Sequence, residues 1–448
     1  MVTKNVPKGQ PVIEIETTVV VETTGTVTTE TGNPEDNMIT ENFKKTILDS
    51  GVTVISENID TVHSVSLGFW LLVGSMNETE ESNGMAHMLE HMVFKKTGKR
   101  SCFDIANDIE SLGGVLNAFT SKSTTCFYVR LMNEYLKAGV DVLSDITVNW
   151  QFNEEDFKKE KTVIYEEIKS VEDNPSDIIF DFHHLQLFPE HSLGRPIQGT
   201  WETVKNFTKE QVINFHKSHY TTKNLLVTAA GKVDHNELVG LVEKYTTNMP
   251  KPSNENNIKP VNPVAVYQKS YKRDIQQAHI LLGRRIFAKS DYRRYYMSLL
   301  NIILSAGLSS RFFNNIREKY GFIYSVYSMT EFYLNEGDFN IYVATDVNKI
   351  DFTKELIFNE LKNIAENGVS EKELEKAKQQ FKGSAMLHLE SMQSRMSRIA
   401  KMEIYEKELQ TIDALLDKIN QISNRNIQYL TQYLYEEDQY VETRIIPN

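Results

Sequence analysis

Two histidines and a glutamate fall within five residues of one apolar stretch, "GMAHMLEHMVF" (84–94). His87 and His91 are four residues apart, so on a helix their imidazoles project from one face and can share a metal ion. Glu90 stands beside the same point, where its carboxylate could take a proton from metal-bound water. Two nitrogen ligands and one oxygen ligand suit zinc and leave its fourth position for water. The pattern indicates a zinc site, although two helical histidines can also meet by chance.

A third ligand is required, and the segment "NEEDFKKEKTVIYEEIK" (153–169) supplies candidates. Phe157 and Ile164 mark the buried face of a helix, and Glu160 and Glu167 lie along the same stripe. Seven residues separate the two acids, which is two turns or roughly 10 Å along the axis. Charged groups on a buried stripe are costly unless they are paired or bound to metal. We therefore expect both acids to face inward, the alternative being that they extend to the rim.

Length and composition narrow the class of protein. With 448 residues, 40% hydrophobic and 25% charged, the chain is predicted to be a soluble globular protein of two or more domains. No run of 18 apolar residues occurs, so no membrane span is expected. A net charge of −12 without a basic cluster argues against nucleic acid and anionic membranes as partners. Cys102 and Cys126 are predicted to be reduced, in keeping with a reducing compartment.

The first 36 residues are rich in Thr, Val and Glu and show no amphipathic period. They carry neither the pattern of a secretory signal nor that of an Arg-rich transit peptide. We expect a disordered tail at 1–36 and a cytoplasmic protein.

The rest of the chain is predicted to form two α/β domains of similar fold. Strand-like and helical patterns alternate from about residue 42, and the Pro-rich stretch "TTNMPKPSNENNIKPVNPV" interrupts them. The same order of elements then starts again. We therefore predict a catalytic domain at 37–245, a linker at 246–266 and a related domain at 267–448.

One local match makes this repeat concrete. Residues 153–159 align with 370–376, since both begin with an N-cap type residue followed by an acid three positions later. Extending the match sets Glu160 opposite Ala377 and Glu167 opposite Ser384. The second half also lacks the histidines, its corresponding helix being "YYMSLLNIIL". Only the first half is therefore predicted to be catalytic.

With these residues the sequence resembles the pitrilysin/insulinase family of zinc endopeptidases, the inverzincins, from residue 38 to the C-terminus. The nearest resemblance is to β-type subunits of the mitochondrial processing peptidase and their bacterial relatives. The family has a glutamate ligand 76 residues after the second histidine, here Glu167. The resemblance implies that His87, His91 and Glu167 hold one Zn²⁺ per chain. Glu90 would be the general base and then the acid, and Glu160 would support the site.

Two further stretches resemble family segments that contact substrate. "GGVLNAFTSKSTTCFYVRL" resembles the substrate-binding edge strand, which implies that Asn117 and Ala118 lie against the substrate backbone. "LSSRFFNNIREKYGFIYSV" matches the stretch that supplies an arginine and a tyrosine seven residues apart, here Arg317 and Tyr324. A third family-like stretch, "HSLGRPIQGT" (191–200), is interpreted as structural.

The resemblance also implies an architecture and an activity. Each domain would be a mainly antiparallel sheet packed with helices, and four such domains from two chains would form a clamshell chamber. The chains would pair as a homodimer or as a heterodimer with a related non-catalytic subunit. The activity would be zinc-dependent hydrolysis of peptides or unfolded segments, in the cytoplasm or, alternatively, the mitochondrial matrix. The rival interpretation is a non-catalytic structural or assembly subunit, although this chain keeps every ligand.

Overall fold

The computed structural model describes residues 41–251 and 260–448. The tail predicted at 1–36 and the middle of the linker predicted at 246–266 lie outside the described residues. The described chain forms two compact units. The first contains the residues up to Val264 together with His388–Ala414, and the second contains Ala265–Leu387 and Leu415–Asn448. Within the described ranges, no helix is long and apolar enough to cross a membrane.

The first unit is built on a six-stranded sheet with the order β1-β2-β6-β3-β5-β4. Neighbouring strands are antiparallel except β2 and β6, which run parallel, so the sheet is mainly antiparallel. Strand β4 lies at one edge. The strands are β1 (Phe43–Ile47), β2 (Thr53–Asn58), β3 (Ser64–Leu71), β4 (Val115–Thr120), β5 (Thr125–Met132) and β6 (Leu225–Gly231).

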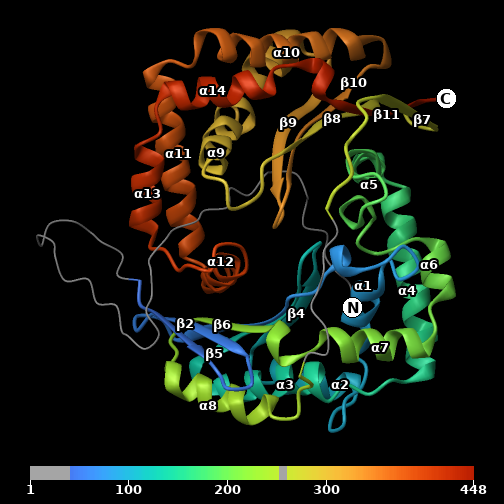
Figure 1. The fold of residues 1–448 in the computed structure, drawn as a ribbon, viewed down its shortest axis with the longest axis vertical. Coiled ribbons are helices and arrows are strands. Elements are labelled where there is room, and N and C mark those ends of the chain that lie inside the picture. Colours follow the sequence, from blue (N-terminus) through green and yellow to red (C-terminus); the bar gives the residue numbers. More distant parts are fainter. Residues whose placement is uncertain (1–40, 252–259) are drawn as a thin grey trace, which may run out of the picture. The chain divides into compact units, whose positions relative to one another are not determined.

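Helices cover both faces of this sheet, and for that reason its central strands are apolar on both sides. In Figure 1, α3 and α8 run along one face and α12 along the other. Leu67 and Phe69 pack toward the first face, whereas Ile55 and Trp70 pack toward Met396 of α12. The helices of the unit are α1 (Met85–Val93), α2 (Cys102–Glu110), α3 (Leu136–Val148), α4 (Glu154–Glu172), α5 (Pro175–Leu187), α6 (Trp201–Asn206), α7 (Lys209–His219), α8 (His235–Thr246) and α12 (Met392–Tyr405).

Helix α12 comes from the C-terminal half of the chain but packs on the first sheet. Buried ion pairs join Arg395 to Glu57 and Arg398 to Glu41. The segment 388–414 therefore groups with the first unit, whereas a division at the Pro-rich stretch assigns it to the second domain. A local linker signal marks where the chain leaves one unit, but it carries no information about a later return.

The second unit has a five-stranded sheet with the order β7-β11-β8-β10-β9. Its one parallel pair, β7 with β11, occupies the place of β2 with β6 in the first sheet. Five strands of the first sheet, β2-β6-β3-β5-β4, therefore recur in the same arrangement in the second, and β1 has no counterpart among the described residues; this confirms the predicted repeat. The elements from residue 265 onward, apart from α12, are β7 (Gln268–Arg273), β8 (Ala278–Ile286), β9 (Ile323–Phe332), β10 (Gly337–Thr345), β11 (Val441–Pro447), α9 (Arg293–Ser305), α10 (Ile350–Asn367), α11 (Glu371–Leu389), α13 (Ile412–Asn420) and α14 (Asn424–Leu434).

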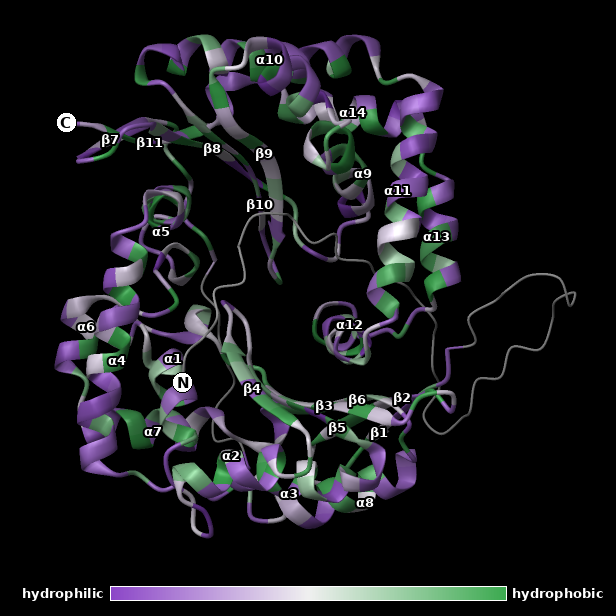
Figure 2. Cartoon of the chain, turned by 180° about the vertical axis from the view of Figure 1, so that it is seen from behind, coloured by the Kyte–Doolittle hydropathy of each residue, from purple (hydrophilic) through white to green (hydrophobic). Residues whose placement is uncertain are grey.

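The helices repeat as well. Asn153 caps α4 by accepting from the Asp156 amide, and the Ser370 hydroxyl accepts from the Glu373 amide at the start of α11. Helix α11 is therefore the counterpart of α4, as the match of 153–159 with 370–376 predicts. Figure 2 shows the mixture of polar and apolar residues along helices such as α3 and α8, one face of which is buried on the sheet.

Candidate metal centre and active site

Helix α1 places the two histidines because its other face is anchored in the core. Met88, Leu89 and Met92 are fully buried, whereas His87 and His91 remain partly exposed. Their ring centroids lie 4.7 Å apart, as expected for residues one helical turn apart.

The start of α1 is held by a buried carboxylate that the sequence motif does not contain. Glu78 accepts hydrogen bonds from the backbone amides of Gly84 and Ala86, both at 2.8 Å. Burial raises the pKa of Glu78 to about 7, although these amides favour the charged form. Gly84 has φ 94°, and a Cβ there would lie 2.7 Å from the carbonyl oxygen of Gln198. The stretch 191–200, interpreted from sequence as structural, therefore packs against the entry to the motif helix.

Helix α4 brings the third donor to the histidines. Glu167 Oε2 lies 3.6 Å from His87 Nε2 and 3.7 Å from His91 Nε2. Zinc bonds of about 2.0–2.2 Å at tetrahedral angles separate neighbouring ligand atoms by about 3.3–3.6 Å. The three donor atoms therefore fit one zinc ion, with a fourth position left for water. Burial lowers the pKa of His87 to about 3, which keeps this imidazole in the neutral form that binds metal.

The two acids of α4 are not equally buried, and one expectation needs correction. Glu160 faces inward, with 7% of its side chain exposed. Glu167 does not lie in a buried stripe, because 45% of its side chain is exposed. A ligand at the rim is consistent with a zinc site that must admit water and substrate.

Glu160 contacts the ring of His91 rather than the point where the three donor atoms converge. Its Oε2 lies 3.0 Å from His91 Nδ1. A proton on Nδ1 donated to this carboxylate leaves the Nε2 lone pair free to bind metal, the usual arrangement for a ligand histidine. Glu160 therefore orients the ring of His91.

Glu90, the predicted base, is held by a residue of the edge strand. The Thr120 hydroxyl donates to Glu90 Oε2 at 2.5 Å. Burial raises the pKa of Glu90, and the hydrogen bond from Thr120 opposes this rise. The carboxylate is therefore fixed beside the two histidines of its own helix, where a general base would be required.

The sequence of the first unit matches a peptidase family model, "Insulinase (Peptidase family M16)", over residues 53–201. Residues 206–381 match "Peptidase M16 inactive domain". A relative from Bacillus subtilis (strain 168), "Uncharacterized zinc protease YmxG", is 36% identical over 397 residues, which is 88% of this chain and 96% of the relative. The chain belongs to peptidase family M16. A relative from Streptomyces coelicolor, "Uncharacterized zinc protease SCO5738", is 35% identical over 85% of this chain and 84% of its own length.

Solved structures share the fold of this M16 chain. A protease from Helicobacter pylori superimposes with a TM-score of 0.85 at 20% identity, covering 91% of this chain and all of that one. A putative M16-like peptidase from Alicyclobacillus acidocaldarius gives a TM-score of 0.80 at 20% identity, over 92% and 99% of the two chains. These likenesses confirm two similar domains with mixed helices and sheets. The family model for the second half is named inactive, in keeping with the missing histidines there.

The M16 chain presents the predicted substrate strand at the edge of its sheet. Residues of β4 alternate between exposed and half-buried, with Asn117 exposed and Ala118 half-buried. The Asn117 side chain accepts from the Ala118 amide at 2.8 Å. An incoming peptide strand that paired with this amide would displace the Asn117 side chain.

Arg317 and Tyr324 come together in the second unit. Arg317 lies in a π-helical turn, Phe312–Glu318, and its Nε donates to the carbonyl oxygen of Tyr324 at 3.1 Å. Tyr324 stands near the start of edge strand β9, and 72% of it is exposed. The two residues form a pair whose phenol is free to meet a ligand.

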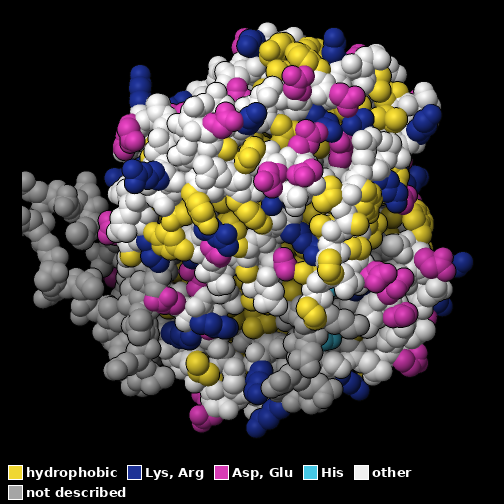
Figure 3. Space-filling view, turned by 45° about the horizontal axis from the view of Figure 1, so that its top comes forward, with side chains coloured by type: hydrophobic (Ala, Val, Ile, Leu, Met, Phe, Trp, Pro, Cys, Tyr) yellow, Lys and Arg dark blue, Asp and Glu magenta, His cyan; other side chains and the backbone are white. Residues whose placement is uncertain are grey.

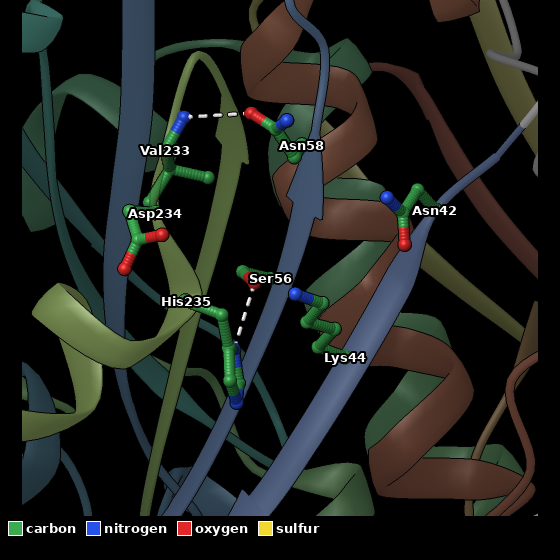
Figure 4. A pocket seen from close by; sticks show the side chains of 7 residues that line it. All are labelled: Asn42, Lys44, Ser56, Asn58, Val233, Asp234 and His235. Carbon is green, nitrogen blue, oxygen red and sulfur yellow. Dashed lines mark hydrogen bonds between the residues drawn. The ribbon is translucent and has the colours of Figure 1, made fainter. Parts of the chain in front are cut away.

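A separate polar pocket lies at the opposite edge of the first sheet, beside β1 and β2 (Figure 4). His235 there is bonded on both ring nitrogens, to Ser56 Oγ at 2.8 Å and to Thr46 Oγ1 at 2.9 Å. A histidine so engaged is a satisfied structural residue. The pocket is lined by Asn42, Lys44, Ser56, Asn58, Val233, Asp234 and His235.

The two cysteines are both free thiols, as expected from the sequence. Cys126 is buried in β5, whereas Cys102 is exposed at the start of α2.

On the face shown in Figure 3, acidic and basic side chains of the described residues are interspersed, and no broad basic tract gathers there. The expectation that the protein does not bind nucleic acid stays a prediction.

If Glu90 acts as a general base, replacing Thr120 by Val should shift the pH dependence of catalysis. The change removes a hydrogen bond that lowers the pKa of Glu90, so this pKa should rise. Because a base must be deprotonated to act, the acid limb of the kcat/KM profile should move to higher pH. At pH values below this limb, kcat/KM should be roughly tenfold lower than in the wild type, the effect of losing one hydrogen bond to a charged group. Thr120→Ser, which keeps the hydroxyl, should retain the wild-type profile, and a Val variant with an unshifted limb would contradict this role.

Proposed function

We propose that this chain is a zinc-dependent endopeptidase that hydrolyses peptide bonds in peptides or unfolded protein segments. The observation that carries the proposal is the convergence of His87, His91 and Glu167 on one point, with Glu90 beside it. A zinc ion held there would polarise the substrate carbonyl and lower the pKa of a coordinated water. Glu90 would accept a proton from that water and return it to the leaving amine.

Substrate would bind by strand addition. The edge strand β4 ends at Thr120, which contacts Glu90, so a peptide paired along β4 would run toward the base. Main-chain hydrogen bonds of this kind give affinity without fixing the side chains of the substrate. Unfolded segments therefore suit the site, because their backbone groups are free to pair, whereas most backbone groups of a folded protein are already paired.

The rival function is that of a non-catalytic structural subunit. Such a subunit would not need the three converging donors, nor Glu160 at hydrogen-bond distance from the ring of His91. The arrangement therefore supports the peptidase. A direct comparison uses purified protein and an internally quenched peptide, with and without a zinc chelator. Chelator-sensitive cleavage that zinc restores supports the peptidase, and a zinc-free protein without cleavage supports the structural subunit.

We also propose that two chains act together in the cytoplasm, as a homodimer or with a related non-catalytic subunit. The support is family membership, since the resemblance implies a chamber of four such domains and one chain supplies two of them. Light scattering gives the molecular mass of the purified protein. The mass of two chains would indicate a homodimer, and the mass of one chain would indicate a monomer that requires a different subunit.

Arg317→Ala and Tyr324→Phe should each lower kcat/KM about tenfold while bound zinc stays at about one per chain. The motivation is that Arg317 holds the backbone carbonyl of Tyr324, whose side chain is exposed, in the unit without metal ligands. Turnover of a quenched peptide and zinc content are measured together. Tyr429→Phe, at a tyrosine of the same unit that is 61% exposed, serves as the control and should be neutral. Loss of zinc, or normal turnover in both variants, would remove the case for substrate contact.

A further inference from the structure

Glu160 is held from two sides, and each of its oxygens has its own partner. Oε2 lies 3.0 Å from His91 Nδ1, and Oε1 lies 2.8 Å from Lys95 Nζ. Side-chain exposure is 7% for Glu160 and 25% for Lys95. The three groups form a row that starts at a proposed metal ligand and ends at a cation close to the surface.

Lys95 reaches this place because of where α1 ends. The helix stops at Val93, and Lys95 follows the C-cap Phe94, four residues after His91. Helices α1 and α4 pack together, so the lysine chain can lie against Glu160 of α4. A cation just beyond a helix C-terminus is also favoured by the helix dipole.

An ordinary surface ion pair would contribute little to this protein. The pair of Lys95 with Glu160 differs because the carboxylate is almost fully buried and its other oxygen faces a ligand ring. A buried carboxylate with one unpaired oxygen would be free to turn, and its hydrogen bond to His91 would lose direction. Lys95 therefore restricts the rotation of the Glu160 carboxylate, and through it the orientation of the His91 ring.

We propose that Lys95 is a positioning residue of the metal centre, acting through Glu160 on His91. Its ammonium holds Oε1, which leaves Oε2 aimed at Nδ1 and the ring turned with Nε2 toward Glu167 Oε2, 3.7 Å away. Lys95 touches neither metal nor substrate. The inference rests on the proposed zinc site and adds to it a residue whose main effect is on metal affinity.

The test compares zinc affinity in full-length variants by competition with a chromophoric chelator at pH 7.5. Lys95→Met should raise the zinc Kd about tenfold, at the lower end of the effect of outer-shell partners. Lys95→Arg keeps the charge and should stay within about threefold of wild type. Lys96→Met is the matched control, since Lys96 is the exposed neighbour, and it should be neutral. Equal thermal melting of the metal-free variants guards against a mere folding defect.

A double-mutant cycle tests the route of the effect. If Lys95 acts through Glu160, Lys95→Met should cost no further zinc affinity in a Glu160→Gln background. Zinc affinity in Lys95→Met equal to that of Lys96→Met would overturn the inference and leave the zinc site intact. If Lys95→Met still raises the zinc Kd about tenfold in the Glu160→Gln background, the inference is overturned as well. A wild-type chain without measurable zinc affinity would overturn the proposed function itself, so the two failures are distinguishable.

Discussion

Glu90→Gln should lose peptide turnover by roughly two to four orders of magnitude, the usual contribution of a positioned general base. Glutamine keeps the size and polarity of the side chain, and its amide oxygen can still accept the hydrogen bond from Thr120. It cannot take a proton from water. Because Glu90 is not among the three converging donors, the variant should retain about one zinc per chain. Single-turnover cleavage of a quenched peptide, with zinc measured on the same sample, gives both quantities.

The control for this prediction is Glu166→Gln, an identical change at an exposed position of α4 beside the proposed ligand Glu167. It should leave turnover and zinc within about twofold of wild type. Peptide binding to Glu90→Gln should also be preserved, because the substrate strand and the metal ligands are unchanged. Residual turnover above a tenth of the wild-type rate would exclude Glu90 as the base.

Arg395→Met should destabilise the first unit by about 3–5 kcal/mol at pH 8, the usual cost of breaking a buried ion pair from one side. Its partner Glu57 is 1% exposed and would be left as an uncompensated buried charge. For a unit of this size the loss corresponds to a fall in its melting temperature of roughly 10 °C. Calorimetry of the full chain measures it.

The stability lost in Arg395→Met should also depend on pH, and the burial of Glu57 determines whether the loss grows or shrinks as the pH rises. Burial raises the pKa of Glu57 to about 7 from 4.5, and Arg395 opposes the rise. A carboxyl with a raised folded-state pKa destabilises the fold as pH rises through the window from 4.5 to 7. Without Arg395 this pKa rises further, so the deficit should be larger at pH 8 than at pH 5.5. Adding Glu57→Leu should recover most of the loss, and a deficit independent of pH would contradict the account.

Local patterns in the sequence were enough to predict that His87 and His91 share one face of a helix. The period of the 153–169 segment also places Glu160 on the buried face of α4, but not Glu167, whose side chain is 45% exposed and which is assigned as third ligand from the family resemblance. The repeat of elements was also predictable, since each half contains the same succession of strand and helix patterns. These features depend on neighbours within two or three turns, which the sequence displays directly.

Contacts between distant segments were not predictable in this way. Glu78 caps α1 from outside the motif, and in the sequence it is one acid within a run of polar residues. Thr120 reaches Glu90 only because β4 and α1 pack together. Helix α12 shows an amphipathic period, but that period does not indicate which sheet its apolar face covers. The alternation of small and large residues on β3 offers one signal, since Gly68 makes room for Met396.

The most direct test of the central claim is the zinc content of purified wild-type, Glu90→Gln and Glu167→Gln chains by atomic absorption, beside cleavage of one quenched peptide. We expect about one zinc per chain in the wild type and in Glu90→Gln, with cleavage by the wild type alone. Glu167→Gln should lose both zinc and activity, because it removes one of three ligands. A metal-free Glu90→Gln chain, or a Glu167→Gln chain that is fully loaded and active, would contradict the assignment of base and ligand.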